Sequence, residues 1–212
     1  MIVHVISYNL LTPLRALVRD LMTFDGVDSI TIIDNASTYQ PLLEWYEKCG
    51  CTVIRREENG GGKVAFQHVD NSDWYVVTDC DLDVSDVPRD ALTKLRKALE
   101  DNPEYKKAGL SLELKDLPET HLTDAIKKWE AKFWQTRLNS QFWVADVDTT
   151  FAVYRPGTLW GGYGPALRSD RPYTCRHAPW YWNLDNLTDE QQYYLGQEII
   201  GTWWTRQARR RT

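Results

Sequence analysis

The N-terminal part of the chain alternates between short apolar runs and amphipathic segments, and this alternation constrains the fold more than any other feature. β-Branched and aromatic residues dominate the short runs, which predicts strands at residues 2–7, 29–33, 52–55 and 74–78. Helical patterns separate these strands. Alternation of this kind predicts an α/β fold with a mostly parallel mixed sheet that is flanked by helices on both faces.

The first two predicted helices have clear boundary signals. Thr12 can cap the first helix and Pro13 fits its first turn, while Pro41 opens the second helix. Apolar residues repeat at helical spacing in each. In the first helix they are Leu14, Leu17, Val18, Leu21 and Met22, and in the second they are Leu42, Trp45, Tyr46 and Cys49.

The second half of the chain is less regular. Helices are predicted at 90–102 and 122–138, and strands at 108–114 and within 141–154. Residues 155–186 are rich in Gly, Pro, Arg and aromatics and show no periodicity, which is typical of a long functional loop. Thr188 is expected to cap a last helix that runs to about Trp204. Without a repeat or a linker, we expect one domain over residues 1–212.

Composition narrows the class of protein. Hydrophobic residues make up 42% of the 212 residues and the net charge is -5, so a globular domain is expected and a general nucleic-acid footprint is not. Basic residues gather only in the tail, at Arg206, Arg209, Arg210 and Arg211. The four cysteines show no zinc or redox spacing, and neither a signal peptide nor a membrane span is recognisable. A cytoplasmic protein is expected.

Carboxylates follow two of the predicted strands. Asp79 and Asp81 come directly after the strand at 74–78, and Asp34 follows the strand at 29–33. Tyr8 follows the first strand. Ligands of open parallel sheets bind beyond the carboxyl ends of the strands, and paired carboxylates suit Mg²⁺ or Mn²⁺. The alternative is that these are ordinary acidic turn residues.

The glycine run at residues 60–62 precedes Lys63. It lacks the G-x-x-x-x-G-K-[ST] spacing of a P-loop, and no G-x-G-x-x-G fingerprint occurs in the chain. The run predicts either a loop near phosphates, with Lys63 as a phosphate contact, or a tight turn.

Several motifs, in this order, carry a resemblance to a known family. Residues 32–38 read I-I-D-N-A-S-T and residues 78–81 read T-D-C-D, which resemble the V-V-D-N-x-S-T and D-x-D motifs of GT-A type nucleotide-sugar glycosyltransferases near family 2. Residues 148–155 and 176–181 are similar to segments of small bacterial and phage members. The resemblance covers about residues 2–182. It departs from the family at the glycine run, where relatives often carry N-x-G-x-x-x-A.

The resemblance implies a GT-A fold and a site for a nucleoside diphosphate sugar, with UDP as the expected nucleotide. Residues 1–85 would form the nucleotide-sugar half, residues 86–187 the acceptor and catalytic half, and residues 188–212 a C-terminal helix and basic tail. The implied donor-site roles are base and ribose contacts from Tyr8, Asn9 and Asp34, metal ligation by Asp81, and ribose or metal contact by Asp79. His177 is a candidate further metal ligand, with a structural role as the alternative.

Other roles leave alternatives open. Arg168, Arg171 or Arg176 would pair with phosphate oxygens, or else serve as surface or loop-anchoring residues. Asp148 is the expected catalytic base of an inverting reaction, with Asp146 as its rival and a turn-capping role as the alternative. Aromatic stacking on sugar or base is as compatible with the sequence as core packing. The residues concerned are Trp160, Trp180 and Tyr181.

The expected activity is metal-dependent transfer of a sugar, with Mn²⁺ or Mg²⁺, to an acceptor hydroxyl. The acceptor is either a hydroxymethylated DNA base, as in a phage, or a bacterial surface glycan. Two alternatives remain: nucleotidyl transfer from a nucleoside triphosphate, and a sugar- or nucleotide-binding module without catalysis. The sequence does not indicate an oligomeric state.

Overall fold

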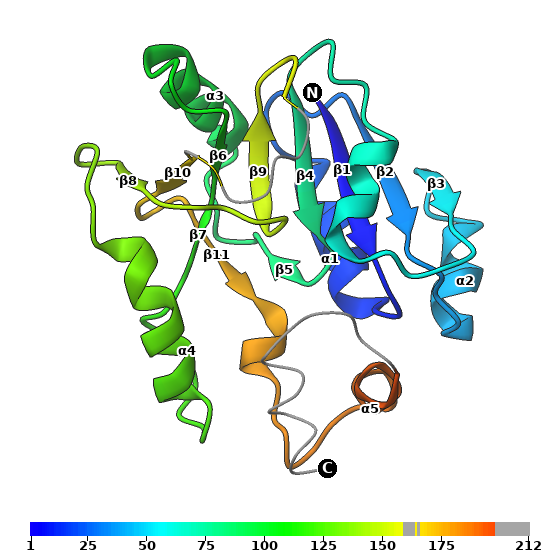
Figure 1. The fold of residues 1–212 in the computed structure, drawn as a ribbon. Coiled ribbons are helices and arrows are strands. Elements are labelled where there is room, and N and C mark those ends of the chain that lie inside the picture. The colour runs from blue at the N-terminus through cyan, green and yellow to red at the C-terminus, as the bar shows by residue number, and fades with distance from the viewer. Residues whose placement is uncertain (159–163, 165, 198–212) are drawn as a thin grey trace.

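The computed structural model describes residues 1–158, 164 and 166–197, and its main sheet organises the chain (Figure 1). This sheet has eight strands in the order β3-β2-β1-β4-β9-β6-β10-β8, and a smaller sheet has the order β5-β11-β7. The strands are β1 (Ile2–Ser7), β2 (Ser29–Asp34), β3 (Thr52–Arg55), β4 (Tyr75–Asp79), β5 (Leu82–Asp83), β6 (Lys107–Gly109), β7 (Ser111–Leu112), β8 (Phe142–Val144), β9 (Phe151–Tyr154), β10 (Ala166–Ser169) and β11 (Thr174–His177).

Helices connect these strands. The α-helices are α1 (Thr12–Leu21), α2 (Gln40–Tyr46), α3 (Ala91–Asp101), α4 (Thr123–Glu130) and α5 (Asp189–Gly196). Three 3₁₀ segments complete the description: η1 (Gly61–Gln67), η2 (Ala131–Trp134) and η3 (Ala178–Tyr181). Figure 1 shows β1 to β4 with α1 and α2 on one side of the molecule, and α3, α4, β8 and β10 on the other.

The N-terminal half of the main sheet is parallel. β1 lies between β2 and β4, and the register pairs Ser7 with Asp34 and Ile6 with Asp79. β9 then runs antiparallel to both β4 and β6, while β10 is parallel to β6. The mostly parallel mixed sheet expected from the sequence is therefore confirmed, and its register brings the ends of β1, β2 and β4 to one edge.

Side chains alternate between the two faces of the sheet, as the pleat requires. Val3 and Val5 of β1 face a core that α1 and α3 cover, while Ile6 faces the opposite side. There the short segment η1 covers the sheet with Val64 and Ala65. The expectation of helices on both faces is met on this second side by a 3₁₀ segment alone, within the part of the chain that the structure describes.

Four predicted elements differ from the structure. Thr12 does not cap α1, because its backbone N–H and hydroxyl both bond Glu190, and Met22 is 58% exposed instead of joining the buried stripe. The predicted strand at 108–114 is broken at Leu110 into β6 and β7, and the helix at 122–138 ends as α4 at Glu130. The irregular stretch at 155–186 contains β10, β11 and η3.

The last helix begins where the sequence indicated. Thr188 accepts a hydrogen bond from the Gln191 N–H, and the Gln191 side chain bonds the Thr188 backbone in return, forming a capping box. The helix ends at Gly196, where Gln197 takes an extended backbone conformation, so it is shorter than the helix to about Trp204 that was expected. Trp160 and the basic tail lie outside the described residues. Among the helices that the structure describes, none has the length and apolarity to cross a bilayer.

Candidate active site

A pocket of about 240 Å³ opens beyond the carboxyl ends of β1 and β4. Five of the residues expected in the site line it: Tyr8, Asp79, Asp81, Asp148 and His177. They come from four separate parts of the chain, and the parallel register of β1 with β4 brings the first two together. Of the residues expected from the strand ends, Tyr8, Asp79 and Asp81 line this pocket and Asp34 does not.

The turn after β4 places the acidic residues. Asp79 ends β4, and the chain reverses into β5, which pairs antiparallel with β11. This pairing sets His177 opposite Leu82, and the Ala178 N–H donates to the Asp81 carbonyl at 2.8 Å. As a result, His177 Nε2 lies 3.2 Å from Asp81 Oδ2. The smaller sheet therefore joins a residue of the second half of the chain to the acidic strand end of the first.

Negative charge is concentrated at this edge. Burial, together with the carboxylates of Asp81 and Asp148, raises the pKa of Asp79 well above its usual range, and a hydrogen bond from the Thr149 hydroxyl at 3.1 Å only partly offsets this. Asp81 Oδ1 is buried with no hydrogen-bond partner. An unpaired buried carboxylate oxygen is costly unless a cation approaches it. The arrangement suits a cation held by hard oxygen ligands.

The protein groups alone do not complete a metal centre. Within residues 1–158, 164 and 166–197, no three His, Cys, Asp or Glu side chains form a cluster that could hold a metal ion. Mg²⁺ is commonly held by one or two carboxylates together with substrate phosphates, so a partial protein shell fits that manner of binding.

Asp148 is positioned by its own turn. Its Oδ1 accepts hydrogen bonds from the Thr150 N–H at 2.9 Å and from the Thr150 hydroxyl. The turn-capping contact expected as an alternative is therefore present, but through Thr150, and it coexists with a place in the pocket wall. The rival residue Asp146 does not belong to that wall, and its carbonyl accepts from Arg168.

The glycine run forms one wall of the pocket through Gly61 and Gly62. Asn35 holds it, because its Oδ1 accepts from the Gly60 N–H at 2.9 Å and its Nδ2 donates to the Gly61 carbonyl at 3.2 Å. Gly61 has φ of +68°, and a Cβ on Gly62 would lie 3.0 Å from the Thr149 side chain. The run is thus a tight turn that also faces the pocket. Lys63 follows it as an exposed residue outside the pocket lining.

Two residues expected to contact the base or ribose instead hold loops together. Asn9 is buried at φ of +51°, and its Oδ1 accepts from the N–H groups of Thr38 and Tyr39. Asp34 is fully buried and accepts from the Tyr46 hydroxyl at 3.0 Å. Neither residue lines the pocket. Both contribute indirectly, because they fix the loops that follow β1 and β2.

The arginines expected to bind phosphate are already engaged elsewhere. Arg168 is buried, with Nη1 3.1 Å from Glu130 Oε2. Arg176 lies between Asp86 and Asp116, with N–O distances of 2.6 and 2.7 Å. The third candidate, Arg171, pairs with Glu113. The structure brings none of the three into the pocket lining, because carboxylates distant in sequence bind them.

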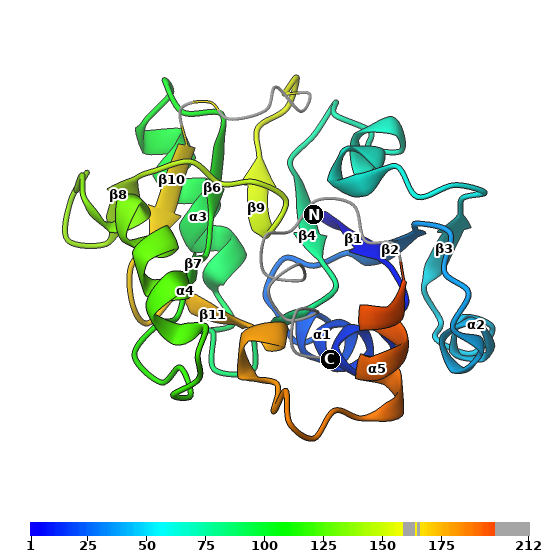
Figure 2. The same cartoon turned by 60° about the horizontal axis from the view of Figure 1, so that its bottom comes forward.

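Sequence reasoning missed Tyr194, which comes from α5 and lines the pocket. Its ring meets Tyr8 edge-on, with centroids 6.5 Å apart, and Trp182 packs on it at 5.9 Å. Thr188 signalled the start of this helix in the sequence but not where the helix packs. Glu190 provides the anchor to Thr12, and Figure 2 shows α5 beside α1. Of the expected stacking residues, Trp180 is buried against His177, at 4.9 Å between centroids.

Comparisons with known proteins show similarity in fold. No family model matches the sequence, and no curated protein matches it. TarS of S. aureus (residues 1–349) matches with a TM-score of 0.50 at 13% identity, covering 84% of this chain and 60% of that one. Glucosyl-3-phosphoglycerate synthase from Mycobacterium tuberculosis, in complex with UDP, has a TM-score of 0.48 at 15% identity and coverages of 73% and 56%.

A third solved structure, CMP:2-keto-3-deoxy-manno-octonic acid synthetase with CTP, has a TM-score of 0.41 at 12% identity, with coverages of 91% and 80%. The match to TarS shows a shared fold, and the GT-A type of fold implied by the sequence resemblance is confirmed. This chain spans 60% of the TarS chain, and at such identity neither activity nor substrate follows from the likeness.

Proposed function

We propose that this chain is a metal-dependent glycosyltransferase that moves a sugar from a UDP-sugar to an acceptor hydroxyl. One observation carries the proposal: Asp79, Asp81 and Asp148 surround a single pocket at the carboxyl edge of the sheet, and Asp81 Oδ1 is buried there without a partner. A diphosphate needs a cation beside it, and this pocket would hold both.

Asp81 would be the main protein ligand of the Mn²⁺ or Mg²⁺ in this proposal. Asp79 and His177 line the same pocket, and they would have to move closer to join Asp81 as ligands, because the three do not form a metal-binding cluster as they stand. The bound cation would supply charge stabilisation for the departing diphosphate. His177 Nε2 already lies 3.2 Å from Asp81 Oδ2, so the imidazole and this carboxylate are adjacent in the pocket.

The nucleoside would lie between the glycine wall and the tyrosines. Tyr8 and Tyr194 provide aromatic faces, and Gly61 and Gly62 have no side chain to obstruct a close approach. Lys63 lies next to this wall and remains our proposed phosphate contact from an exposed position.

Asp148 would act as the general base of an inverting transfer. It would accept the proton of the acceptor hydroxyl as the oxygen attacks the sugar carbon. Its Oδ1 is fixed by Thr150, which orients the carboxylate before substrate binds. The acceptors we consider are a hydroxymethylated DNA base and a surface glycan. The four cysteines are free, which supports a reducing cytoplasmic setting.

The test is release of nucleoside diphosphate. The protein is incubated with a panel of nucleoside diphosphate sugars and Mn²⁺, and the products are separated by chromatography. We expect slow release of UDP from at least one donor, abolished by EDTA and by Asp81→Asn. The matched control Asp83→Asn changes a carboxylate on β5 outside this pocket and should leave the rate within about twofold.

Full activity in Asp81→Asn would contradict the metal assignment. Pyrophosphate release from a nucleoside triphosphate, without any release of UDP from sugars, would instead establish nucleotidyl transfer.

Asp148→Asn tests the proposed base. Donor binding should persist while transfer falls by roughly 10²–10⁴-fold, as loss of a general base implies. Asp146→Asn is the matched control, since that residue lies outside the pocket wall. If Asp146→Asn lost activity and Asp148→Asn kept it, the assignment of the base would be wrong.

A further inference from the structure

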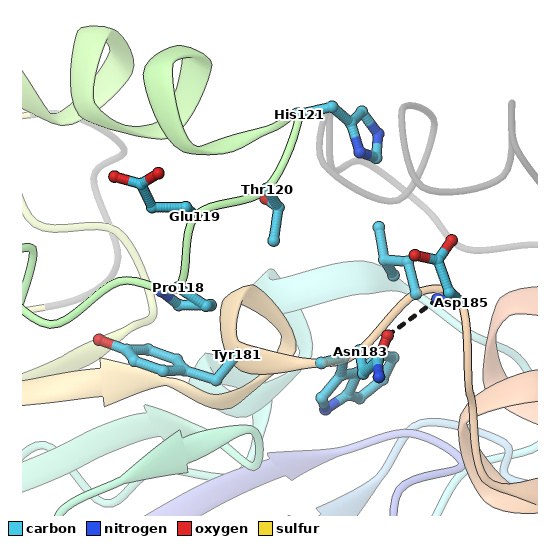
Figure 3. Close-up of a pocket in the computed structure, with 9 residues that line it drawn as sticks. Pro118, Glu119, Thr120, His121, Tyr181, Asn183 and Asp185 are labelled. Atoms are coloured by element: carbon cyan, nitrogen blue, oxygen red, sulfur yellow. Dashed lines mark hydrogen bonds between the residues drawn. The ribbon is translucent and has the colours of Figure 1, made fainter.

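A second pocket, of about 420 Å³, lies between two segments of the C-terminal half of the chain (Figure 3). Residues 118–121, which precede α4, form one side, and residues 181–185, which begin with the last residue of η3, form the other. Its volume falls within the usual range of small-molecule sites. Neither the metal site nor the base belongs to it.

The pocket is built from fixed parts. The Thr123 hydroxyl donates to the Pro118 carbonyl at 2.7 Å and accepts from the Thr120 N–H at 2.8 Å. These two bonds hold the segment at residues 118–121 in place. On the other side, the Asn183 side chain accepts from the Asp185 N–H at 3.1 Å, the contact drawn in Figure 3. The cavity is therefore formed before any ligand arrives.

Its lining combines aromatic faces with neutral and acidic polar groups. Tyr181 and Trp182 supply the rings, and the Tyr181 hydroxyl is tied to Asp116 at 2.7 Å, so its ring has a fixed orientation. Glu119 and Asp185 supply carboxylates, and the described residues that line the pocket include neither Lys nor Arg. Aromatic faces suit the C–H face of a sugar ring, and carboxylates accept its hydroxyl protons. A phosphate-bearing ligand would meet repulsion here.

The pocket neighbours the proposed donor site. η3 alone separates His177 of the donor pocket from Trp182 of the second pocket, a span on the order of 10 Å at the 3₁₀ rise per residue. Trp182 also packs on Tyr194, whose ring lines the donor pocket. An acceptor of a few linked rings would be long enough to cover this distance.

We infer that this second pocket binds a neutral saccharide and that this saccharide is the acceptor of the transfer. The assignment as acceptor rests on the proposed function, whereas the binding itself does not. Of the two acceptor classes considered above, the acidic and aromatic lining favours the glycan over DNA.

Histidine NMR tests the inference, because the chain has only four histidines. His121 lines the second pocket and His177 lines the donor pocket, so the two ring signals report on separate sites. His121→Gln and His177→Gln identify the signals. The full chain is titrated with maltotriose, cellotriose and triacetylchitotriose, and separately with UDP and Mg²⁺ and with a single-stranded oligonucleotide.

At least one neutral trisaccharide should shift the His121 signal in a saturable way. The double variant Glu119→Ala with Asp185→Ala should weaken that binding at least tenfold, while Glu104→Ala, an exposed carboxylate outside the pocket, should not. No shift of His121 by any of the three sugars up to their solubility limits would overturn the inference. A stronger shift by the oligonucleotide, or sugar binding unchanged in the double variant, would do the same.

The two proposals fail separately in this experiment. If UDP with Mg²⁺ does not shift the His177 signal, the proposed donor site is contradicted. If no sugar shifts the His121 signal, only the proposed saccharide pocket is contradicted.

Discussion

His4 shows how a single residue couples this fold to pH. It lies on β1 with its ring edge-on to Tyr75, at 6.3 Å between centroids, and its Nδ1 is buried without a hydrogen-bond partner. Burial, and then the nearby His68, lower the pKa of His4 to about 4. The folded state therefore holds the imidazole neutral, and protonating it opposes folding.

The sign of the pH dependence follows. The pKa of His4 is lower in the folded chain than the unfolded value near 6.5. The stability that depends on a neutral His4 is therefore complete above about pH 6.5 and is lost as pH falls towards 4. The loss amounts to about 1.4 kcal/mol per pH unit, on the order of 3 kcal/mol in all. Urea unfolding of wild type and His4→Phe should give stability curves that separate below pH 6. Parallel curves down to pH 4 would contradict this.

For single residues, the sequence predicted which side chains line the pocket better than it predicted which residues they bond. Asp79 and Asp81 line the pocket because they follow a strand of the parallel half of the sheet. Asp148 and His177, which the resemblance implied, line the same pocket from the turn before β9 and from the end of β11. Arg168 shows what could not be predicted. Its partner Glu130 lies 38 positions away, and only the fold brings the two together. A polar residue near a strand end can contact a ligand or hold a loop in place. The sequence pattern is the same for both roles and does not distinguish them.

At the scale of elements, α5 couples the end of the described chain to its start. Glu190 accepts from both the N–H and the hydroxyl of Thr12, at 2.8 and 2.6 Å, and the Tyr193 hydroxyl donates to Thr38 at 2.9 Å. These contacts seat Tyr194 against the pocket. The helix therefore belongs to the architecture of the proposed donor site.

Glu190→Ala should detach this helix. Removing both hydrogen bonds should lower stability by about 2–3 kcal/mol, speed amide hydrogen exchange in α5, and weaken UDP binding as Tyr194 leaves the pocket wall. Asp189→Ala is the matched control, because Asp189 is an exposed carboxylate in the same helical turn. Unchanged exchange in α5 of Glu190→Ala would refute the anchoring role.

Prediction of elements succeeded where periodicity was clear. The strands of the parallel half and the capping box at Thr188 lie where the sequence indicated. β10 and β11 escaped prediction because Arg168 and Arg176 interrupt any apolar alternation. The buried Arg168 pairs with Glu130, whereas Arg176 is partly exposed and pairs with Asp86 and Asp116.

At the scale of the whole molecule, β9 joins the two halves. It pairs antiparallel with β4 on one side and with β6 on the other, so the main sheet runs without interruption from one half to the other. One hydrophobic cluster includes Leu14 of α1, Leu95 of α3 and Leu167 of β10. We therefore propose a single cooperative domain.

Urea unfolding monitored by tryptophan fluorescence and by far-UV circular dichroism should give one coincident transition. Tryptophans are concentrated in the second half of the chain, whereas circular dichroism reports on all of it. Two separated midpoints would show that residues 1–85 and 86–187 unfold independently.

The central claim is that Asp81 and its neighbours hold a cation on the diphosphate of a sugar donor. Crystals grown with UDP and Mn²⁺ test it through anomalous scattering, which locates the metal directly. We predict one peak about 2 Å from an Asp81 carboxylate oxygen and from a phosphate oxygen of UDP. UDP bound outside this pocket, or a manganese peak away from Asp81 with UDP in place, would contradict the account.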